Sequence, residues 1–64
     1  MKVIKYIAKP HTLFDEGTEA ELIEDYRYDE KNPLHAGLFV GYVKGKLDEE
    51  TVGFDSFDII EVEI

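Results

Sequence analysis

The sequence has no cysteine and no tryptophan, and its 7 lysine and arginine residues are outnumbered by 15 acids. Without cysteine the chain can form neither a disulfide nor a thiolate metal site, which fits a reducing cytoplasm. No apolar run approaches the roughly 20 residues that span a bilayer, and lysines interrupt the N-terminal stretch MKVIKYIAKPH. The sequence therefore predicts a cytoplasmic protein with neither a membrane span nor a signal peptide.

A chain of 64 residues predicts one small domain over 1–64, because dividing it would leave neither half a viable core. Its net charge of −8 would repel nucleic acids and anionic membranes, so we expect direct binding to neither. The charges fall in blocks, with net positive segments at 1–11 and 31–47 and net negative segments at 12–30 and 48–64. This alternation suggests that oppositely charged segments lie beside each other in the fold.

Valine, isoleucine, tyrosine and phenylalanine dominate the apolar residues, and this composition favours strands. Strands are predicted over 3–8, over 18–28, in the two arms of a hairpin within 37–54, and over 58–64. Lys44 and Gly45 form the expected hairpin turn, and the segment FDSF at 54–57 is typical of a single helical turn. A loop at 9–17, with Gly17 as a positive-φ position, and a polar connection at 29–36 complete the chain.

The segment 18–28 leaves two interpretations open. As a strand it has Ala20 and Leu22 on one face, and a slip of phase at Ile23 predicts a bulge. As a helix it would begin with the capping-box pair Thr18 and Glu21. Dense acidic residues favour the strand.

Alternation along the strands predicts which side chains are buried. The expected core contains Leu22, Val40, Tyr42, Ile60 and Val62, with Leu38 and Ile64 on the same inward faces. Glu61 and Glu63 are expected to point outward, toward the lysines of the first strand, of which Lys5 is one example.

Five short strands in this order can bury a shared interior only by curling into a small barrel or by forming two orthogonal sheets. Over nearly its whole length the sequence then resembles a Src-homology-3-like barrel. TLFDEG (12–17) stands at that family's Ala-Leu-Tyr-Asp-Tyr segment, LF (38–39) at its tryptophan pair, and GFDSFDII (53–60) at its C-terminal helical turn. The resemblance implies a mainly β, five-stranded barrel with one short helical turn near the C-terminus and paired terminal strands.

The departures from that family bear on function. Its proline-rich peptide recognition relies on a tryptophan and a helical-turn proline, but this chain lacks tryptophan and carries Asp55 at the proline position. Phe14 and Phe57 stand where groove tyrosines would supply hydroxyls. We therefore do not expect proline-rich recognition. The small, acidic, cysteine-free chain is also similar to accessory proteins of bacteria and their prophages.

Catalytic, cofactor and metal sites are not expected. Ser56, the only serine, lies in a turn where a hydroxyl commonly caps backbone amides, and His11 and His35 fall in separate loops. A chain of this size offers little room for a deep cleft that would shift carboxylate pKa values. The acidic stretches 14–19 and 47–51 lack the alternating spacing of a calcium loop.

A binding function is expected instead, and its partner is predicted to be a protein with a basic patch or segment. The candidate acidic residues are Asp15, Glu16, Glu19, Glu21, Asp48, Glu49 and Glu50. One alternative is an inhibitor that imitates nucleic acid, in which Glu61 and Glu63 would extend an acidic stripe if the second and last strands shared a face. A second alternative is an aromatic groove for a peptide, formed by Phe14, Phe39 and Phe57. Against these stand two plainer interpretations: the acids pair internally, and Phe14 and Phe57 close the ends of the barrel.

Overall fold

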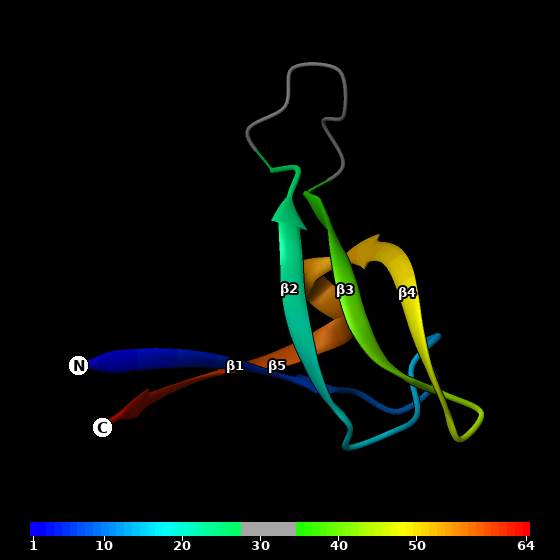
Figure 1. The fold of residues 1–64 in the computed structure, drawn as a ribbon, viewed down its shortest axis with the longest axis horizontal. Helices are drawn as coiled ribbons and strands as arrows, with labels where there is room; N and C mark the ends of the chain where they lie inside the picture. Colours follow the sequence, from blue (N-terminus) through cyan, green and yellow to red (C-terminus); the bar gives the residue numbers. More distant parts are fainter. Residues whose placement is uncertain (28–34) are drawn as a thin grey trace.

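The computed structural model describes residues 1–27 and 35–64, so most of the polar connection predicted at 29–36 lies outside the described residues. The chain forms one five-stranded antiparallel sheet in the order β4-β3-β2-β1-β5 (Figure 1). In chain order its elements are β1 (Lys2–Ala8), β2 (Glu19–Asp25), β3 (Ala36–Val43), β4 (Lys46–Gly53), the 3-10 turn η1 (Phe54–Ser56) and β5 (Phe57–Glu63). The predicted mainly β fold with a helical turn near the C-terminus is confirmed, and the helical alternative for 18–28 is wrong.

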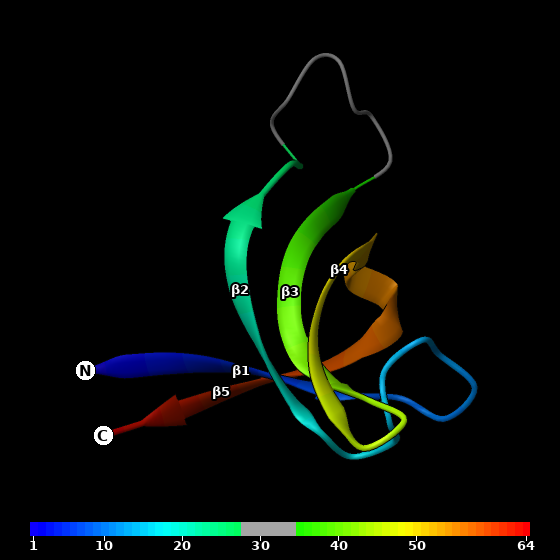
Figure 2. The same cartoon turned by 45° about the vertical axis from the view of Figure 1, so that its right-hand side comes forward.

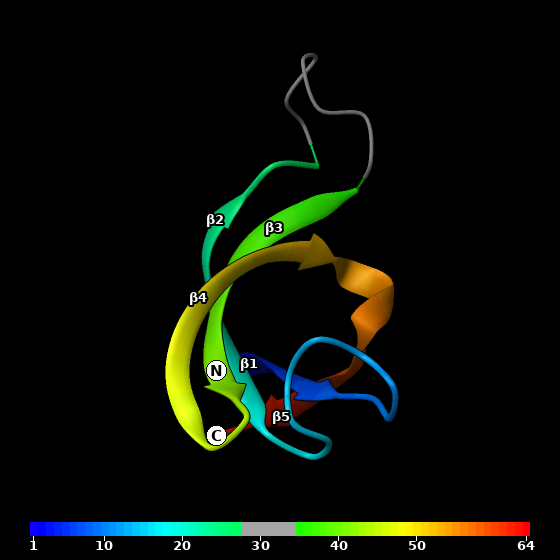
Figure 3. The ribbon, with the colours of Figure 1, turned by 90° about the vertical axis from the view of Figure 1, so that its right-hand side faces the viewer.

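The sheet bends at β2, the strand that its two crossing parts share. Figure 1 shows β1 and β5 crossing the direction of β2, β3 and β4, which curve together in Figure 2. In Figure 3, β4 bends around one side and η1 returns the chain to β5. β2 pairs with β1 at its start and with β3 along most of its length, and a bulge between Leu22 and Glu24 lets it bend. The phase slip at Ile23 therefore has the predicted cause.

The interior is a cluster of aromatic rings. Phe39 is fully buried, and its ring centroid lies 4.4 Å from that of Phe57 and 5.2 Å from those of Tyr6 and Phe54. Phe14 joins from the loop between β1 and β2, 5.7 Å from Phe57 between centroids. Edge-to-face and tilted pairs of this kind contribute about 0.5–1.5 kcal/mol each beyond the area they bury. The core of this small domain is therefore mainly aromatic rather than aliphatic.

Two glycines make room for these rings. A Cβ atom on Gly41 would lie 3.1 Å from the Phe14 ring, and one on Gly37 would lie 3.1 Å from both the Glu24 carbonyl oxygen and the Phe54 ring. Contacts this close force the neighbouring atoms to move. Both glycines lie an even number of residues from Phe39, so the three residues share the inner face of β3.

This arrangement corrects the predicted buried face of β3. Phe39 points inward, so Leu38, Val40 and Tyr42 point outward, and the Tyr42 side of the strand is open enough to leave that residue 50% exposed. Side chains of a strand alternate, so a one-residue error of phase exchanges the two faces completely. The prediction assigned the interior to the larger number of apolar side chains, but one phenylalanine between two glycines occupies it.

The same error affects β5. Three aliphatic residues predicted to point inward are at least partly exposed, namely Ile60, Val62 and Ile64. Phe57 is only 2% exposed and sets the phase of the strand. Glu61 and Glu63 are exposed as predicted, although they share the Phe57 side of the strand and lie beyond the aromatic cluster.

Pairing of the terminal strands closes the fold. β1 and β5 are in register from Lys2 opposite Glu63 to Ala8 opposite Phe57. The Lys2 Nζ atom lies 2.9 Å from Glu61 Oε1, so a first-strand lysine does meet a last-strand glutamate. Lys5 instead lies 4.0 Å from an acid of β2. Exposed pairs of this kind contribute only about 0–1 kcal/mol.

Arg27 covers the end of the aromatic cluster beside η1. Its guanidinium carbon lies 4.1 Å from the centroid of the Phe54 ring. The same guanidinium donates hydrogen bonds of 2.6 to 3.0 Å to both carboxylate oxygens of Asp25. These side-chain bonds, with a further bond from the Arg27 backbone N–H, hold the pKa of Asp25 below its usual value.

Candidate partner-binding surface

Asp15 fastens the loop between β1 and β2 to the turn between β3 and β4. Its two carboxylate oxygens accept hydrogen bonds of 2.8 Å from the backbone N–H groups of Lys44 and Gly45. Its own N–H donates to the Tyr42 carbonyl oxygen at 2.8 Å. Lys44 and Gly45 have φ values of 51° and 79°, as a tight hairpin turn of the I′ type requires. A carboxylate predicted to meet a partner is thus used within the fold, whereas its neighbour Glu16 is exposed.

The other predicted acids are divided between the two sides of the sheet. We call the side of β2, β3 and β4 that faces away from the aromatic cluster the outer face. The register places Glu19, Glu21 and Glu49 on the outer face. Asp48 and Glu50 lie on the opposite side of β4, where Glu50 is half-buried. The acids of β4 therefore do not form one continuous row.

On the inner side of β4, the carboxylate of Asp48 affects that of Glu50. Partial burial raises the pKa of Glu50, and a hydrogen bond and charge repulsion from Asp48 raise it further. Protonation of Glu50 removes the charge repulsion and the cost of burying a charged group. This pair is a place where negative charge is crowded at some cost to the folded state.

A strip of apolar side chains runs along the outer face. We call it the apolar strip, and it consists of Leu38, Val40 and Tyr42 of β3 with Leu47 of β4. Tyr42 is 50% exposed and its cross-strand partner Leu47 is 65% exposed. Val40 lies directly between Glu21 of β2 and Glu49 of β4. Carboxylates therefore flank the strip on both of its long sides.

The three phenylalanines predicted to form a groove belong to the core. Phe14, Phe39 and Phe57 are 2%, 0% and 2% exposed. Rings without exposed area cannot contact a partner, so the aromatic-groove prediction is wrong for these residues. Phe14 and Phe57 instead pack within the aromatic cluster, where the Phe57 ring centroid lies 4.4 Å from that of Phe39 and 5.7 Å from that of Phe14.

The acidic stripe considered for β2 and β5 does not form. Tyr6 points to the interior, and the register with β5 places Glu61 and Glu63 on that same side of the paired strands. Glu19 and Glu21 lie on the opposite side of β2. The two pairs of glutamates thus lie on different faces.

Alternation along the sequence placed Tyr42 in the core, whereas it is a surface residue of the outer face. The signal that could have found it is the spacing of Gly37, Phe39 and Gly41, because glycine within a strand often marks a close approach of other atoms. Two glycines on either side of one phenylalanine indicate a strand face that packs closely against large side chains. Tyr42 lies on the other face of the strand, which is then the solvent side.

The histidines and acids of the described residues do not gather into a metal site. His11 and His35 are both exposed, with φ values of 64° and 48°. No group of three or more histidine or acidic residues in 1–27 and 35–64 is arranged to hold a metal ion. Within the same ranges, no helix has the length and apolar character needed to cross a membrane.

No family model, no curated protein and no solved structure matches this chain. Among the surfaces described, the outer face combines the exposed apolar strip with carboxylates in register on either side.

Proposed function

We propose that this protein is a non-enzymatic binding module that engages a protein carrying a basic patch or segment, and that it does so through the apolar strip. The observation that carries the proposal is the row formed by Glu21, Val40 and Glu49 across three neighbouring strands. An apolar centre with a charged rim is the usual anatomy of a protein interface. Apolar side chains of the partner would pack on Tyr42 and Leu47, while its lysines or arginines would meet the rim.

The two parts of the surface have different roles in this proposal. Burial of the exposed apolar side chains supplies affinity, because large residues near the centre of an interface carry most of the binding energy. The flanking carboxylates accelerate encounter and select a partner of opposite charge. Binding should therefore weaken at high salt without being abolished.

We further propose that the chain is a cytoplasmic Src-homology-3-like barrel. Support comes from the element order, in which a hairpin and a 3-10 turn precede a last strand that pairs with the first. The lack of cysteine supports the compartment. Proline-rich recognition is not part of the proposal, because Phe14 and Phe57 are buried and Asp55 stands at the proline position.

Selection from a random peptide library displayed on phage, followed by affinity measurement on synthetic peptides, tests the proposal. We expect selected peptides that combine lysine or arginine with aliphatic or aromatic residues. The double variant Tyr42→Ala, Leu47→Ala should weaken binding by about tenfold or more, which corresponds to ~1.4 kcal/mol. Glu49→Lys should also weaken it and should reduce its dependence on salt.

Glu16→Lys is the matched control, because it changes charge by the same amount at an exposed position in the loop between β1 and β2. An equal loss for Glu16→Lys and Glu49→Lys would show that net charge matters and the outer face does not. Selected peptides rich in lysine and arginine but without apolar residues, with affinity insensitive to Tyr42→Ala, would favour imitation of nucleic acid over the present proposal.

A further inference from the structure

β1 and β2 separate after a short stretch of pairing. Their register contains only Tyr6 opposite Ala20 and Ile7 opposite Glu19, although each strand is 7 residues long. Beyond this point β1 is paired only with β5, and β2 is paired only with β3. Figure 1 shows the two strands diverging toward their far ends. An opening therefore lies between two strands that are neighbours in the sheet.

Backbone groups of both strands point into this opening. Ala8 N–H donates to the Thr18 carbonyl oxygen at 2.9 Å, so the even-numbered residues of β1 direct their N–H and C=O groups toward β2. The next such residue beyond Tyr6 is Ile4, and its counterpart in β2 is Leu22. No pair joins Ile4 and Leu22 in the register. Two strand edges whose main-chain groups are not paired with each other thus face one another.

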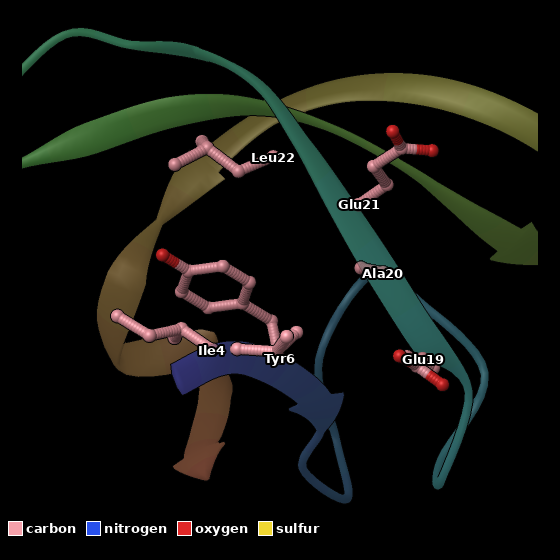
Figure 4. A pocket seen from close by; sticks show the side chains of 7 residues that line it. Ile4, Tyr6, Glu19, Ala20, Glu21 and Leu22 are labelled. Atoms are coloured by element: carbon pink, nitrogen blue, oxygen red, sulfur yellow. The ribbon is translucent and has the colours of Figure 1, made fainter. Parts of the chain in front are cut away.

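The opening is also a hollow with a defined lining. It has a volume of about 450 Å³ and is lined by Val3, Ile4, Tyr6, Glu19, Ala20, Glu21 and Leu22. Figure 4 shows Ile4, Tyr6 and Leu22 gathered on one side of β2, with Glu21 on the other. Ile4 is 54% exposed. The hollow is therefore apolar toward the interior and acidic toward the outer face.

The charges of the lining select one kind of occupant. Glu19 is 4.0 Å from Lys5, where β1 and β2 still pair. Glu21 is exposed, and none of the ion pairs recorded for residues 1–27 and 35–64 includes it. A strand lying in the opening would present alternate side chains to the apolar side and to Glu21. A segment that alternates apolar and basic residues matches both the apolar side of the opening and the carboxylate of Glu21.

We propose that the opening between β1 and β2 binds an extended segment of a partner protein that alternates apolar and basic residues and adds as a β-strand along the free edge of β1. Main-chain hydrogen bonds to Ile4 supply affinity, and the side-chain alternation supplies specificity, as in other cases of strand addition. This site borders the apolar strip and shares Glu21 with its rim, but its apolar lining and its main-chain contacts come from β1 and β2 instead of β3 and β4.

The test uses a short peptide of alternating lysine and valine, titrated into the isotopically labelled protein and followed by NMR. We expect saturable shifts centred on Ile4 and Leu22, and amide exchange at Ile4 that slows by about tenfold or more on binding. A peptide of the same composition with its lysines and valines in separate blocks should bind more weakly. A version with N-methyl groups on alternate residues, which cannot complete the main-chain bonds, should lose binding.

Variants separate this site from the apolar strip. Ile4→Lys should abolish binding of the alternating peptide, whereas Leu13→Lys, the same change at a residue 50% exposed in a distant loop, should preserve it. Tyr42→Ala should have no effect. The proposal is overturned by shifts centred on Tyr42, by an N-methylated peptide that binds equally well, or by no saturable binding. Concentration-dependent shifts of Ile4 without peptide would also overturn it, because the occupant would then be a second copy.

Discussion

The bridge made by Asp15 can be removed with a single substitution, Asp15→Ala. The change deletes two hydrogen bonds of 2.8 Å from backbone N–H groups to an ionised carboxylate. Bonds to charged groups contribute about 1.5–3 kcal/mol each when well shielded. Lys44 and Gly45 are exposed, so their freed N–H groups can bind water and the loss is smaller. We expect a loss of about 2 kcal/mol in the free energy of unfolding.

For a domain of this size, ~1 kcal/mol shifts the melting temperature by roughly 4–8 °C, so the expected decrease is roughly 8–16 °C. Thermal and urea melts followed by circular dichroism measure it. Amide exchange should also accelerate at Lys44 and Gly45. Asp15→Asn, which keeps one acceptor oxygen, should fall between the two proteins.

Glu16→Ala is the matched control, since it removes the same charge from the adjacent exposed residue. We expect it to leave the melting temperature nearly unchanged or to raise it slightly, because the protein carries excess negative charge. Equal melting temperatures for Asp15→Ala and Glu16→Ala would refute the idea that the carboxylate holds the two loops together.

Three further predictions concern the interior, the crowded acids and closure of the fold. Gly37→Ala should destabilise by about 1–3 kcal/mol in urea melts, because its Cβ would meet the Glu24 carbonyl oxygen at 3.1 Å, and an unchanged midpoint would contradict this packing. Because the pKa of Glu50 is raised in the folded state, its ionisation lowers stability as pH rises through that pKa. Glu50→Gln should therefore raise the melting temperature near neutral pH and have little effect well below the ordinary glutamate pKa. Equal effects at the two pH values would exclude ionisation as the cause. Deleting residues 60–64 removes the β1–β5 residue pairs from Lys5–Ile60 to Lys2–Glu63 and should abolish cooperative melting. A truncated chain that still melts in one sharp transition would show that the fold does not need this part of β5.

The order of the elements was predictable from local patterns. Turn residues at 44–45, the FDSF segment and the phase slip at Ile23 each have a local physical cause, and each was found where the sequence places it. Their effect does not depend on distant parts of the chain. For this reason a single sequence was enough to locate them.

The inward and outward faces of β3 and β5 were not predictable from alternation alone. Both faces of β3 carry apolar residues, so counting them does not decide which is buried. The decision depends on how Phe54 and Phe57 meet Phe39 and on how Phe14 meets Phe57, and those contacts join distant segments. The same limitation concealed the apolar strip, because its β3 members were assigned to the core. The role of Asp15 was equally hidden, since its partners are 29 and 30 residues away.

The pairing of β1 with β5 has a consequence for how the chain reaches its fold. The hairpin of β3 and β4 closes a very short loop, whereas Lys2 finds its partner Glu63 only at the other end of the chain. Loop-closure entropy grows with the length of the loop, so the hairpin should form early and the terminal pair last. Substitutions in the hairpin should then slow folding, and substitutions in β5 should mainly speed unfolding. During synthesis β1 emerges before the other strands and waits longest for its partner β5. Until then it is a largely apolar strand with an unpaired edge, and it is the segment most exposed to pairing with another chain.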